Sequence, residues 1–466
     1  MSETLPYPSA LDALPPPWKE DVLPEIRRKL VESGKKVFVL DDDPTGTQTV
    51  RDLYVVTDWE VETLARQFDR PEPGCFVLTN SRALNEEETG NLHRELATKL
   101  ETAAAGRPFT LVSRSDSTLR GHFPLETDTL AEVLGGFDLV VLAPYFGAGG
   151  RLTLHGEHYV AEDDQLVPAA RTPFARDPAF SYSHSFLPAY VEEKTGGRIK
   201  AGSVRVLDIE LIRQGGPEVV CRELRNASAP TVFTVDACCD RDIEVFAAGA
   251  VKAESAGRRI LYRSAAGLVA ARLGQSVPPV LQGGELHAGG PSGGLVVVGS
   301  YVPKTTAQLE TLRTDERLEF LELDVQRVLE ADSAAEYLME VESELLIRIF
   351  GGRHTVLHTS RRYVSGSSAA SSLRIGQKVS NALVRLVTGL GVRPRFLVAK
   401  GGITSSDIAT RALAVREARV LGQVHPGVPV WETGPESRFP GLPYVVFPGN
   451  VGGPDALLQV ILKLLD

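Results

Sequence analysis

Short runs of apolar residues alternate with stretches of helical periodicity along most of the chain. In the N-terminal part the runs lie at 37–40, 75–78, 109–112, 139–142, 204–207, 232–235 and 260–262. Helical stretches separate them, at 61–68, 86–101, 125–134, 217–224 and 243–256. Short apolar runs that alternate with helices are typical of βαβ units, in which a parallel sheet is covered on both faces.

The chain changes character at 275–294, where Gly, Pro and Ser accumulate as they do in linkers. A second series follows, with runs at 295–298, 318–323, 355–358, 396–399 and 444–447, and helical stretches at 305–314, 334–350, 371–388, 406–413 and 454–465. The pattern predicts an α/β protein with two domains, at 1–285 and 286–466, each with a mainly parallel sheet flanked by helices. The stretch 144–187 has few strand or helix signals, so we expect an irregular loop.

Length and charge narrow the range of functions. A chain of 466 residues exceeds the ~250–300 residues of a single core, which agrees with two domains. The formal net charge of −10 disfavours a nucleic-acid partner. No apolar run approaches the ~20 residues that span a bilayer, and the N-terminus has no secretory pattern. We therefore expect a cytoplasmic protein without a membrane partner, and small-molecule ligands.

The first apolar run ends in three aspartates, in the sequence Asp-Asp-Asp-Pro-Thr-Gly-Thr at 41–47. Ligands of open α/β sheets bind beyond the carboxyl ends of the strands, so strand ends are where chemistry is expected. Adjacent carboxylates repel one another unless cations or hydrogen bonds compensate them. Asp42 and Asp43 could accept hydroxyl hydrogens from a polyol, or hold Mg²⁺ through water.

Arginines and hydroxyls follow the next two runs. Arg82 ends the sequence Thr-Asn-Ser-Arg, and Arg114, Asp116 and Arg120 lie in Ser-Arg-Ser-Asp-Ser-Thr-Leu-Arg-Gly-His at 113–122. A guanidinium matches a carboxylate with its planar fork, whereas hydroxyls suit a polyol. The alternative is that these arginines only neutralise the aspartates nearby. Either interpretation predicts a pocket of mixed charge, which suits a hydroxy acid.

The second domain has glycine-rich strand ends. They read Gly-Ser-Tyr-Val-Pro-Lys-Thr-Thr at 299–306, Lys-Gly-Gly-Ile-Thr-Ser-Ser-Asp at 400–407 and Pro-Gly-Asn-Val-Gly-Gly at 448–453. Glycine lets a backbone approach a ligand closely, and N–H groups at a helix start bind phosphate. Three such ends in one domain favour a phosphate-binding site, although the chain has neither a Walker A motif nor an intact G-x-G-x-x-G.

Taken together, these motifs resemble the four-carbon acid sugar kinases, long grouped as a domain of unknown function. The resemblance rests on Asp-Asp-x-Thr-Gly, Asn-Ser-Arg, Asp-Ser-Thr-Leu-Arg-Gly and the three glycine-rich ends, and it spans roughly 37–465. Position 114 is Arg where many members have Lys, and the loop at 145–180 resembles that of a longer subgroup.

The resemblance implies ATP-dependent phosphorylation of a hydroxyl on a short sugar acid, such as threonate, erythronate, 3-oxo-tetronate or 3-oxo-isoapionate. It implies that Mg²⁺ bridges the ATP phosphates, and no residue is assigned as a metal ligand. The sugar-acid residues implied for the N-terminal domain are Asp42, Asp43, Arg82, Arg114, Ser115, Asp116 and Ser117. The nucleotide residues implied for the C-terminal domain are Ser300, Gly401, Gly402, Ile403, Thr404 and Gly449.

For the reaction, we expect Arg82 and Arg114, with Arg120, to hold the substrate carboxylate. Asp43 or Asp116 would take the proton of the attacking hydroxyl. Two alternatives stay open: a sugar-acid isomerase or dehydratase that needs no ATP, and a non-catalytic sensor of a sugar acid or nucleotide. A homodimer is a further expectation.

Overall fold

The computed structural model describes residues 3–286, 288–330, 333–361, 364 and 369–465. The chain forms two compact units. Unit 1 consists of Met1–Val50 and Asp58–Pro278, and unit 2 consists of Arg51–Thr57 and Pro279–Asp466. The sequence predicted domains at 1–285 and 286–466, one for the sugar acid and one for the nucleotide. This division stays a prediction.

Unit 1 contains a parallel sheet. Its strands are β2 (Lys36–Asp41), β4 (Gly74–Leu78), β5 (Phe109–Arg114), β6 (Leu139–Ala143), β10 (Arg205–Leu207), β11 (Thr231–Val235) and β12 (Ile260–Ser264). Their order is β10-β11-β6-β12-β5-β2-β4, and each neighbouring pair is parallel. Every residue of β4 and β12 is buried, as expected for strands covered on both faces.

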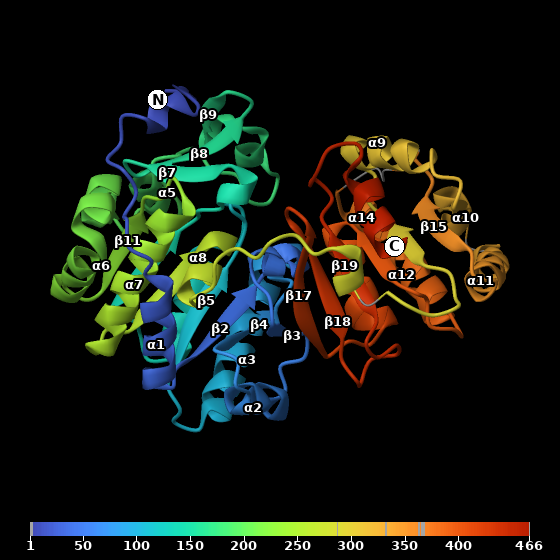
Figure 1. Ribbon diagram of the computed structural model, residues 1–466, viewed down its shortest axis with the longest axis horizontal. Helices are drawn as coiled ribbons and strands as arrows, with labels where there is room; N and C mark the ends of the chain where they lie inside the picture. The colour runs from blue at the N-terminus through green and yellow to red at the C-terminus, as the bar shows by residue number, and fades with distance from the viewer. Residues whose placement is uncertain (1–2, 287, 331–332, 362–363, 365–368, 466) are drawn as a thin grey trace. The chain divides into compact units, whose positions relative to one another are not determined.

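Helices of unit 1 pack in two groups, α2 with α3 and α4, and α1 with α6, α7 and α8 (Figure 1). The helices are α1 (Leu23–Ser33), α2 (Val61–Asp69), α3 (Glu86–Ala104), α4 (Leu125–Val133), α5 (Leu187–Lys194), α6 (Ile209–Asn226), α7 (Asp240–Ser255) and α8 (Ala266–Arg272). A capping box starts α3, because the Asn85 side chain accepts from the Glu88 N–H and Glu88 bonds back to the Asn85 N–H.

The stretch 144–187 contains a small antiparallel sheet, so the expectation of an irregular loop is wrong. Its strands are β7 (Arg151–Leu154), β8 (Glu157–Glu162) and β9 (Gln165–Pro168), with β1 (Leu5–Pro6) at its edge. The turn between β7 and β8 places His155 and Gly156 at φ of 51° and 76°. Buried Asp236 accepts both of their N–H groups, at 2.6 and 2.8 Å. This distant carboxylate fixes a turn that lacks the usual Asn-Gly signal.

Unit 2 has a mixed sheet. Its strands are β3 (Leu53–Val56), β13 (Leu295–Val298), β14 (Leu318–Leu323), β15 (His354–Thr359), β16 (Leu397–Lys400), β17 (Glu417–His425), β18 (Val428–Thr433) and β19 (Pro443–Phe447). The order is β3-β17-β18-β19-β16-β13-β15-β14. The pairs from β19 to β14 are parallel, and those from β3 to β19 are antiparallel. The apolar pattern predicted the parallel strands and missed β3, β17 and β18.

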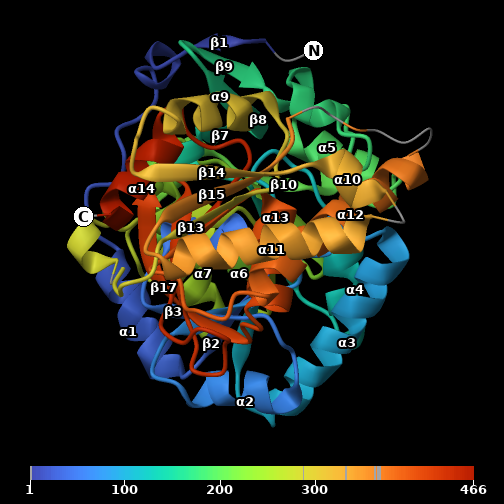
Figure 2. The same ribbon diagram turned by 90° about the vertical axis from the view of Figure 1, so that its right-hand side faces the viewer.

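The helices of unit 2 pack against this sheet; α11, for example, contacts β14 and β15 (Figure 2). The helices are α9 (Pro303–Leu312), α10 (Val325–Leu329), α11 (Ala334–Phe350), α12 (Ala369–Thr388), α13 (Gly402–Asp407) and α14 (Ala456–Leu465). A π-helix, Ile408–Ala412, continues α13. Leu309 of α9 and Leu457 of α14 are buried in one core with Val298, Val398 and Phe447 of the sheet. The predicted class, α/β with mainly parallel sheets flanked by helices, is confirmed.

No helix in the part of the chain that the structure describes is long and apolar enough to cross a membrane.

A matched pair of glycines before β13 tests the packing of unit 2. A Cβ at Gly293 would lie 2.0 Å from the Arg353 carbonyl oxygen, whereas a Cβ at Gly289 would meet nothing within 4 Å. We expect Gly293→Ala to lower the free energy of unfolding by about 1–3 kcal/mol, as overpacking does, and Gly289→Ala to leave it nearly unchanged. Urea unfolding followed by circular dichroism measures both, and equal effects of the two substitutions would contradict the packing described.

Candidate functional site

The guanidinium of Arg82 joins three of the aspartates at the carboxyl edge of the unit 1 sheet. Its Nε and Nη2 donate to Oδ2 and Oδ1 of Asp42, at 3.1 and 2.6 Å. Its Nη1 lies 3.7 Å from Asp43 Oδ2 and 3.9 Å from Asp116 Oδ1. The structure therefore brings together residues that follow β2, β4 and β5, as the sequence predicted for neighbouring strand ends.

Backbone hydrogen bonds fasten the turn that carries Arg82 to the end of β2. The N–H of Thr79 donates to the Asp41 carbonyl at 2.8 Å, and the N–H of Arg82 donates to the Asp42 carbonyl at 3.4 Å. Asn80, between them, has a left-handed φ of 52°, a conformation that asparagine tolerates better than most residues. The position of the guanidinium is thus set by the backbone as well as by its ion pairs.

Asp42 and Arg114 are buried behind this edge. Ser115 Oγ donates to Asp42 Oδ2 at 2.5 Å, and Arg114 Nη1 lies 3.8 Å from Asp42 Oδ1. The same Nη1 donates to Asp41 Oδ1 at 3.1 Å, and only 5% of the Arg114 side chain is exposed. Arg114 thus contacts two aspartates of the chain itself, and its predicted contact with a substrate carboxylate stays a prediction.

Asp43 and Asp116 each have one oxygen that accepts close hydrogen bonds from the chain. Thr45 donates to Asp43 Oδ1 from its N–H and its hydroxyl, at 2.9 and 2.6 Å, whereas no described residue donates a close hydrogen bond to Oδ2. Asp116 Oδ2 accepts from Arg120 Nε at 2.8 Å and from the Thr118 hydroxyl. The other oxygen of each carboxylate, Asp43 Oδ2 and Asp116 Oδ1, therefore has Arg82 Nη1 as its nearest described partner, at 3.7 and 3.9 Å.

Both of these carboxyl groups are ionised at neutral pH. Burial raises the pKa of Asp43, but the charge of Arg82 and the hydrogen bonds from Thr45 outweigh burial and leave the pKa below its ordinary value. Burial likewise raises the pKa of Asp116, and Arg82 and Arg120 together lower it far below the ordinary value. Each group can therefore accept a hydrogen bond from a hydroxyl.

Asp41, at the end of β2, is the buried exception. Burial raises its pKa to about 7, although the charge of Arg114 opposes the shift. Its Oδ2 has no hydrogen-bond partner in the described structure. Gly46 covers it, since a Cβ there would lie 1.9 Å from Oδ2. Asp41 is thus closed off from a ligand.

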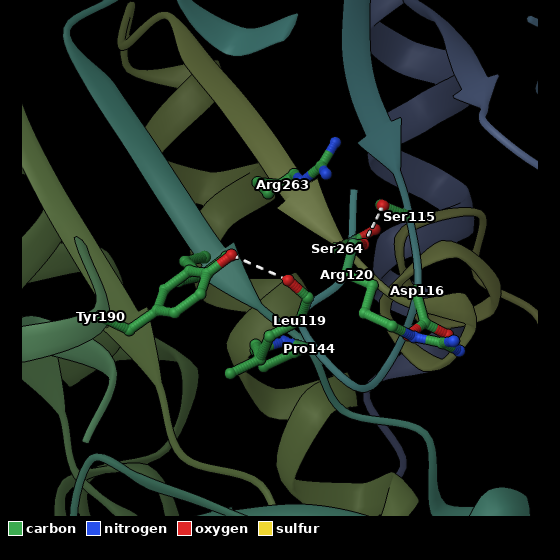
Figure 3. A pocket seen from close by; sticks show the side chains of 9 residues that line it. Ser115, Asp116, Leu119, Arg120, Pro144, Tyr190, Arg263 and Ser264 are labelled. Atoms are coloured by element: carbon green, nitrogen blue, oxygen red, sulfur yellow. Dashed lines mark hydrogen bonds and ion pairs between the residues drawn. The ribbon is translucent and has the colours of Figure 1, made fainter. Parts of the chain in front are cut away.

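A small cavity adjoins the Arg–Asp cluster (Figure 3). It is lined by Ser115, Asp116, Leu119, Arg120, Leu142, Pro144, Tyr190, Arg263 and Ser264. Its volume of ≈ 10 Å³ is about that of one water, so a sugar acid could occupy only its mouth. The Tyr190 hydroxyl donates to the Leu119 carbonyl at 2.9 Å, and the Ser115 N–H donates to the Ser264 carbonyl at 2.8 Å.

Ser117 does not line this cavity; it is buried, and a histidine holds its carbonyl. His158 Nε2 donates to the Ser117 carbonyl at 2.7 Å, and His158 Nδ1 lies 2.9 Å from Thr153 Oγ1. Burial lowers the pKa of His158 to about 4, so the ring is neutral at neutral pH.

Among the residues that the structure describes, no group of three or more His, Cys, Asp or Glu side chains could hold a metal ion.

Arg151, at the start of β7, is a candidate that the sequence prediction missed. Its guanidinium carbon and that of Arg120 lie 5.6 and 5.1 Å from the centre of the Phe174 ring. Arg120 is paired with Asp116 and Asp177, whereas Arg151 has no ion pair with any described residue. The glycines before Arg151 were the available signal, but they indicated a loop rather than a role for this side chain.

Three glycine-rich loops meet around Ser300 in unit 2. A Cβ at Gly401 would lie 3.4 Å from Ser300 Cβ, and a Cβ at Gly449 would lie 3.6 Å from Ser300 Oγ. Thr404 Oγ1 would be 2.3 Å from a Cβ at Gly299. Gly401 has a φ of 118°, which only glycine adopts readily. The structure thus brings Ser300, Gly401, Thr404 and Gly449 together, as predicted.

The other two predicted nucleotide residues begin α13. Gly402 and Ile403 follow Gly401 directly, and the Ile403 side chain is 62% exposed. An exposed apolar side chain beside three polar loops is available to contact the base or sugar of a ligand. Its predicted part in nucleotide binding stays a prediction.

The loop 448–453 turns its carbonyls toward one set of side chains. They accept hydrogen bonds, at 2.8–3.5 Å, from Lys304, Thr305, Gln308 and Lys400. In a trans peptide the N–H points opposite to the preceding carbonyl, so the N–H groups of 449–452 face the other way. None of them donates to a described residue. Successive N–H groups of this kind form an anion-binding concavity.

Three basic side chains surround these loops without a carboxylate partner among the described residues. Lys304, Arg361 and Lys400 have no ion pair with any described residue, and each donates to backbone carbonyls. Arg361 Nη1 donates to the Ser300 carbonyl at 2.7 Å, and its Nη2 donates to Thr306 Oγ1 at 2.8 Å. The sequence prediction assigned none of these three side chains to the site. Together with the N–H groups of the 448–453 loop, they suit a polyanion such as a chain of phosphates.

Two family models match the chain. One, described as a sugar-binding N-terminal domain, matches residues 37–272, and the other, described as a nucleotide-binding C-terminal domain, matches residues 295–457.

Characterised relatives cover much of the chain at low identity. A D-threonate kinase of Salmonella typhimurium is 27% identical over 91% of this chain and 97% of its own. A D-erythronate kinase of Heliobacterium modesticaldum is 25% identical over 66% of this chain and 67% of its own. A 3-oxo-tetronate kinase of Pseudomonas fluorescens is 28% identical over 76% of this chain and 78% of its own.

Two solved structures share the fold. A Haemophilus influenzae protein aligns with a TM-score of 0.63 and 17% identity over 92% of this chain and 100% of its own. A Salmonella typhimurium protein described as a putative tRNA synthase aligns with a TM-score of 0.67 and 17% identity over 91% and 98%. At this identity the likeness concerns the fold alone.

The raised pKa of Asp41 gives a pH-dependent stability. Between the ordinary pKa of 3.8 and the folded value of about 7, Asp41 keeps its proton in the fold and loses it on unfolding. Stability should therefore fall as pH rises through this window, by about 1.4 kcal/mol per pH unit. Asp41→Asn mimics the protonated form and lacks this dependence.

The measurement is urea unfolding of the native chain and of Asp41→Asn at several pH values between about 4.5 and 6.5. The difference in unfolding free energy between the two should change steadily in favour of the variant as pH rises. Substitution of the exposed Asp12 by Asn is the control and should show a constant difference. Parallel pH curves for the native chain and Asp41→Asn would contradict the assignment.

Proposed function

The chain belongs to the four-carbon acid sugar kinase family, and from that premise we propose that it transfers the γ-phosphoryl group of ATP to a hydroxyl of a short sugar acid. One observation carries the proposal: the two units have complementary sites. Unit 1 has an Arg–Asp cluster that can accept hydroxyl hydrogens. Unit 2 has basic side chains, and N–H groups without a partner among the described residues, that suit a polyphosphate. The names of its relatives support a four-carbon acid as substrate. Candidates are threonate, erythronate, 3-oxo-tetronate and the branched 3-oxo-isoapionate.

The substrate carboxylate is best assigned to Arg151. Arg82 and Arg114 already neutralise aspartates of the chain, and Arg120 is shared between two others. Arg151 has no such partner, and burial of its unpaired Nε lowers its pKa, so an incoming carboxylate would relieve an unfavourable environment. Arg120, on the same Phe174 ring, would act beside it.

Asp43 is the proposed acceptor of the hydroxyl proton. Thr45 holds its Oδ1, and its Oδ2 remains available to orient the attacking hydroxyl. As the substrate hydroxyl oxygen attacks the γ-phosphorus, its proton passes to Asp43 Oδ2. The bond between the γ-phosphorus and the leaving oxygen of ADP breaks. Asp116 is less suited, because Arg82 and Arg120 together lower its pKa far below the ordinary value and make it a weak base.

On the nucleotide side, the N–H groups of 449–452 and the cations Lys304 and Arg361 are the proposed phosphate ligands, and Lys400 holds the loop through its carbonyls. No described cluster of acidic or histidine side chains is large enough to hold a metal by itself, so Mg²⁺ would be held mainly by the phosphates and water. When bound, Mg²⁺ neutralises phosphate charge. A cytoplasmic location and a homodimer stay predictions.

The decisive experiment is a screen of four- and five-carbon sugar acids for ADP release that depends on both ATP and the acid. Stoichiometric formation of a phosphorylated acid would support the proposal. Turnover of an acid without ATP would instead support the isomerase or dehydratase alternative. Binding of both ligands without product would support the sensor.

Asp43→Asn tests the proton acceptor. Asparagine can still accept the two hydrogen bonds from Thr45, but its amide cannot take a proton. We expect kcat to fall by roughly 10²–10⁴-fold, the usual range for loss of a general base, with little change in KM for ATP. Steady-state kinetics measure both, and a kcat within a few-fold of the native value would assign the proton to another group.

Arg151→Gln tests the carboxylate contact, with Arg171→Gln as an exposed control from the same segment. Loss of a charge-assisted hydrogen bond of about 1.5–3 kcal/mol should raise KM for the acid by roughly 10–100-fold and leave KM for ATP unchanged. The control should affect neither constant. Arg82→Ala is a poorer test, because it would also leave the buried Asp42 without its bidentate partner. An unchanged KM for the acid in Arg151→Gln would exclude this role.

A further inference from the structure

Lys400, at the end of β16, is a buried lysine without an acidic partner. Its side chain is fully buried, and it has no ion pair with any described residue. Its Nζ lies 2.8 Å from the Pro448 carbonyl oxygen and 3.4 Å from that of Gly449. Lys400 therefore holds the 448–453 loop through carbonyls that point away from the N–H groups of that loop.

The number of acceptors around Nζ matches a neutral amine. A neutral lysine has two N–H bonds, and the two carbonyls accept them, whereas an ammonium has a third N–H for which no described residue provides an acceptor. The face of the Phe447 ring, 4.2 Å from Nζ, favours the cation. Burial and the charge of Lys304 oppose it, and together they lower the pKa of Lys400 to about 7.

The neighbouring elements supply no compensating negative charge. On α9, Lys304 adds a positive charge. On α13, Asp407 is held by Ser380 and by Arg411, whose Nη1 is 3.4 Å away. On β19, the Tyr444 hydroxyl donates to the Ser405 carbonyl at 2.6 Å, and burial raises its pKa well above the ordinary value, so it stays neutral.

We propose that Lys400 is a positioning residue of the nucleotide site and that binding of a nucleotide's phosphates draws one proton from solvent onto its Nζ. The inference rests on the proposed nucleotide site. The phosphates would bind the N–H groups of the 448–453 loop, and Lys400 would face them across the peptide units whose carbonyls it holds. Their negative charge stabilises the ammonium, so the lone pair of the neutral amine takes a proton released by the buffer acid.

The consequence is a pH-dependent affinity whose sign is fixed. Above the apo pKa of about 7 the empty site holds mainly neutral Lys400, while the occupied site holds the ammonium. Nucleotide affinity should therefore fall as pH rises, by up to about tenfold per unit, until the pKa of the occupied site is reached. Below this window Lys400 is protonated in both the empty and the occupied site, so it should no longer make the affinity depend on pH.

The test is calorimetric titration of the full chain with ADP at saturating Mg²⁺. Each titration is run at about pH 6 and about pH 8, in two buffers that differ in ionisation enthalpy. The native chain should take up little proton at the lower pH and close to one per ADP at the higher pH. Lys400→Met should abolish the difference, and its titration corrects for ionisation of ADP itself. The exposed Lys378→Met is the matched control and should behave as the native chain does.

A second variant keeps the test decisive if Lys400→Met does not fold. Lys304→Met removes the charge that disfavours the ammonium, so the onset of proton uptake should move to higher pH. ADP binding without proton uptake at pH 8, or uptake that persists in Lys400→Met, would overturn the inference and leave the kinase proposal intact. Failure of the native chain to bind any adenine nucleotide would overturn the proposed function itself, and this inference with it.

Discussion

The bidentate pair between Arg82 and Asp42 is the interaction on which the unit 1 site depends. It joins the turn after β4 to the end of β2, and the third guanidinium nitrogen faces Asp43 and Asp116. Because Asp42 is almost fully buried, removing its partner would leave an uncompensated charge, which typically costs about 3–5 kcal/mol. The close approach of the other carboxylates follows from this pair, since without a shared cation they would repel one another.

The two units differ in whether their charged side chains are paired with opposite charges. Unit 1 balances its aspartates internally with Arg82, Arg114 and Arg120, so its site is close to neutral before a ligand arrives. Unit 2 leaves three basic side chains against backbone carbonyls, with no carboxylate among the described residues paired with them. A net charge of −10 is compatible with both, because local groups rather than the overall charge determine where a small anion binds.

The sequence was most informative where one physical rule decides the outcome. Strands buried on both faces are continuous apolar runs, so β2, β5 and β16 could be placed, and the convergence of Asp43 with Arg82 followed from the shared edge of a parallel sheet. β17 escaped because Arg419 and Gln423 interrupt its apolar residues, and β18 because Pro429 is unusual inside a strand. The lack of an ion pair at Lys400 and at Arg151 could not be predicted from the sequence, because it depends on which acidic side chains the fold brings near them.

One feature of the chain path bears on how the protein could be divided. Arg51–Thr57 departs from the segment around it in sequence and supplies β3, which pairs with β17 in unit 2. No single continuous stretch of sequence therefore encodes the whole of unit 2. A fragment that starts at Pro279 would expose the backbone groups of β17 as an unprotected sheet edge, prone to self-association. Split-protein complementation or circular permutation would have to keep this short strand with the C-terminal piece.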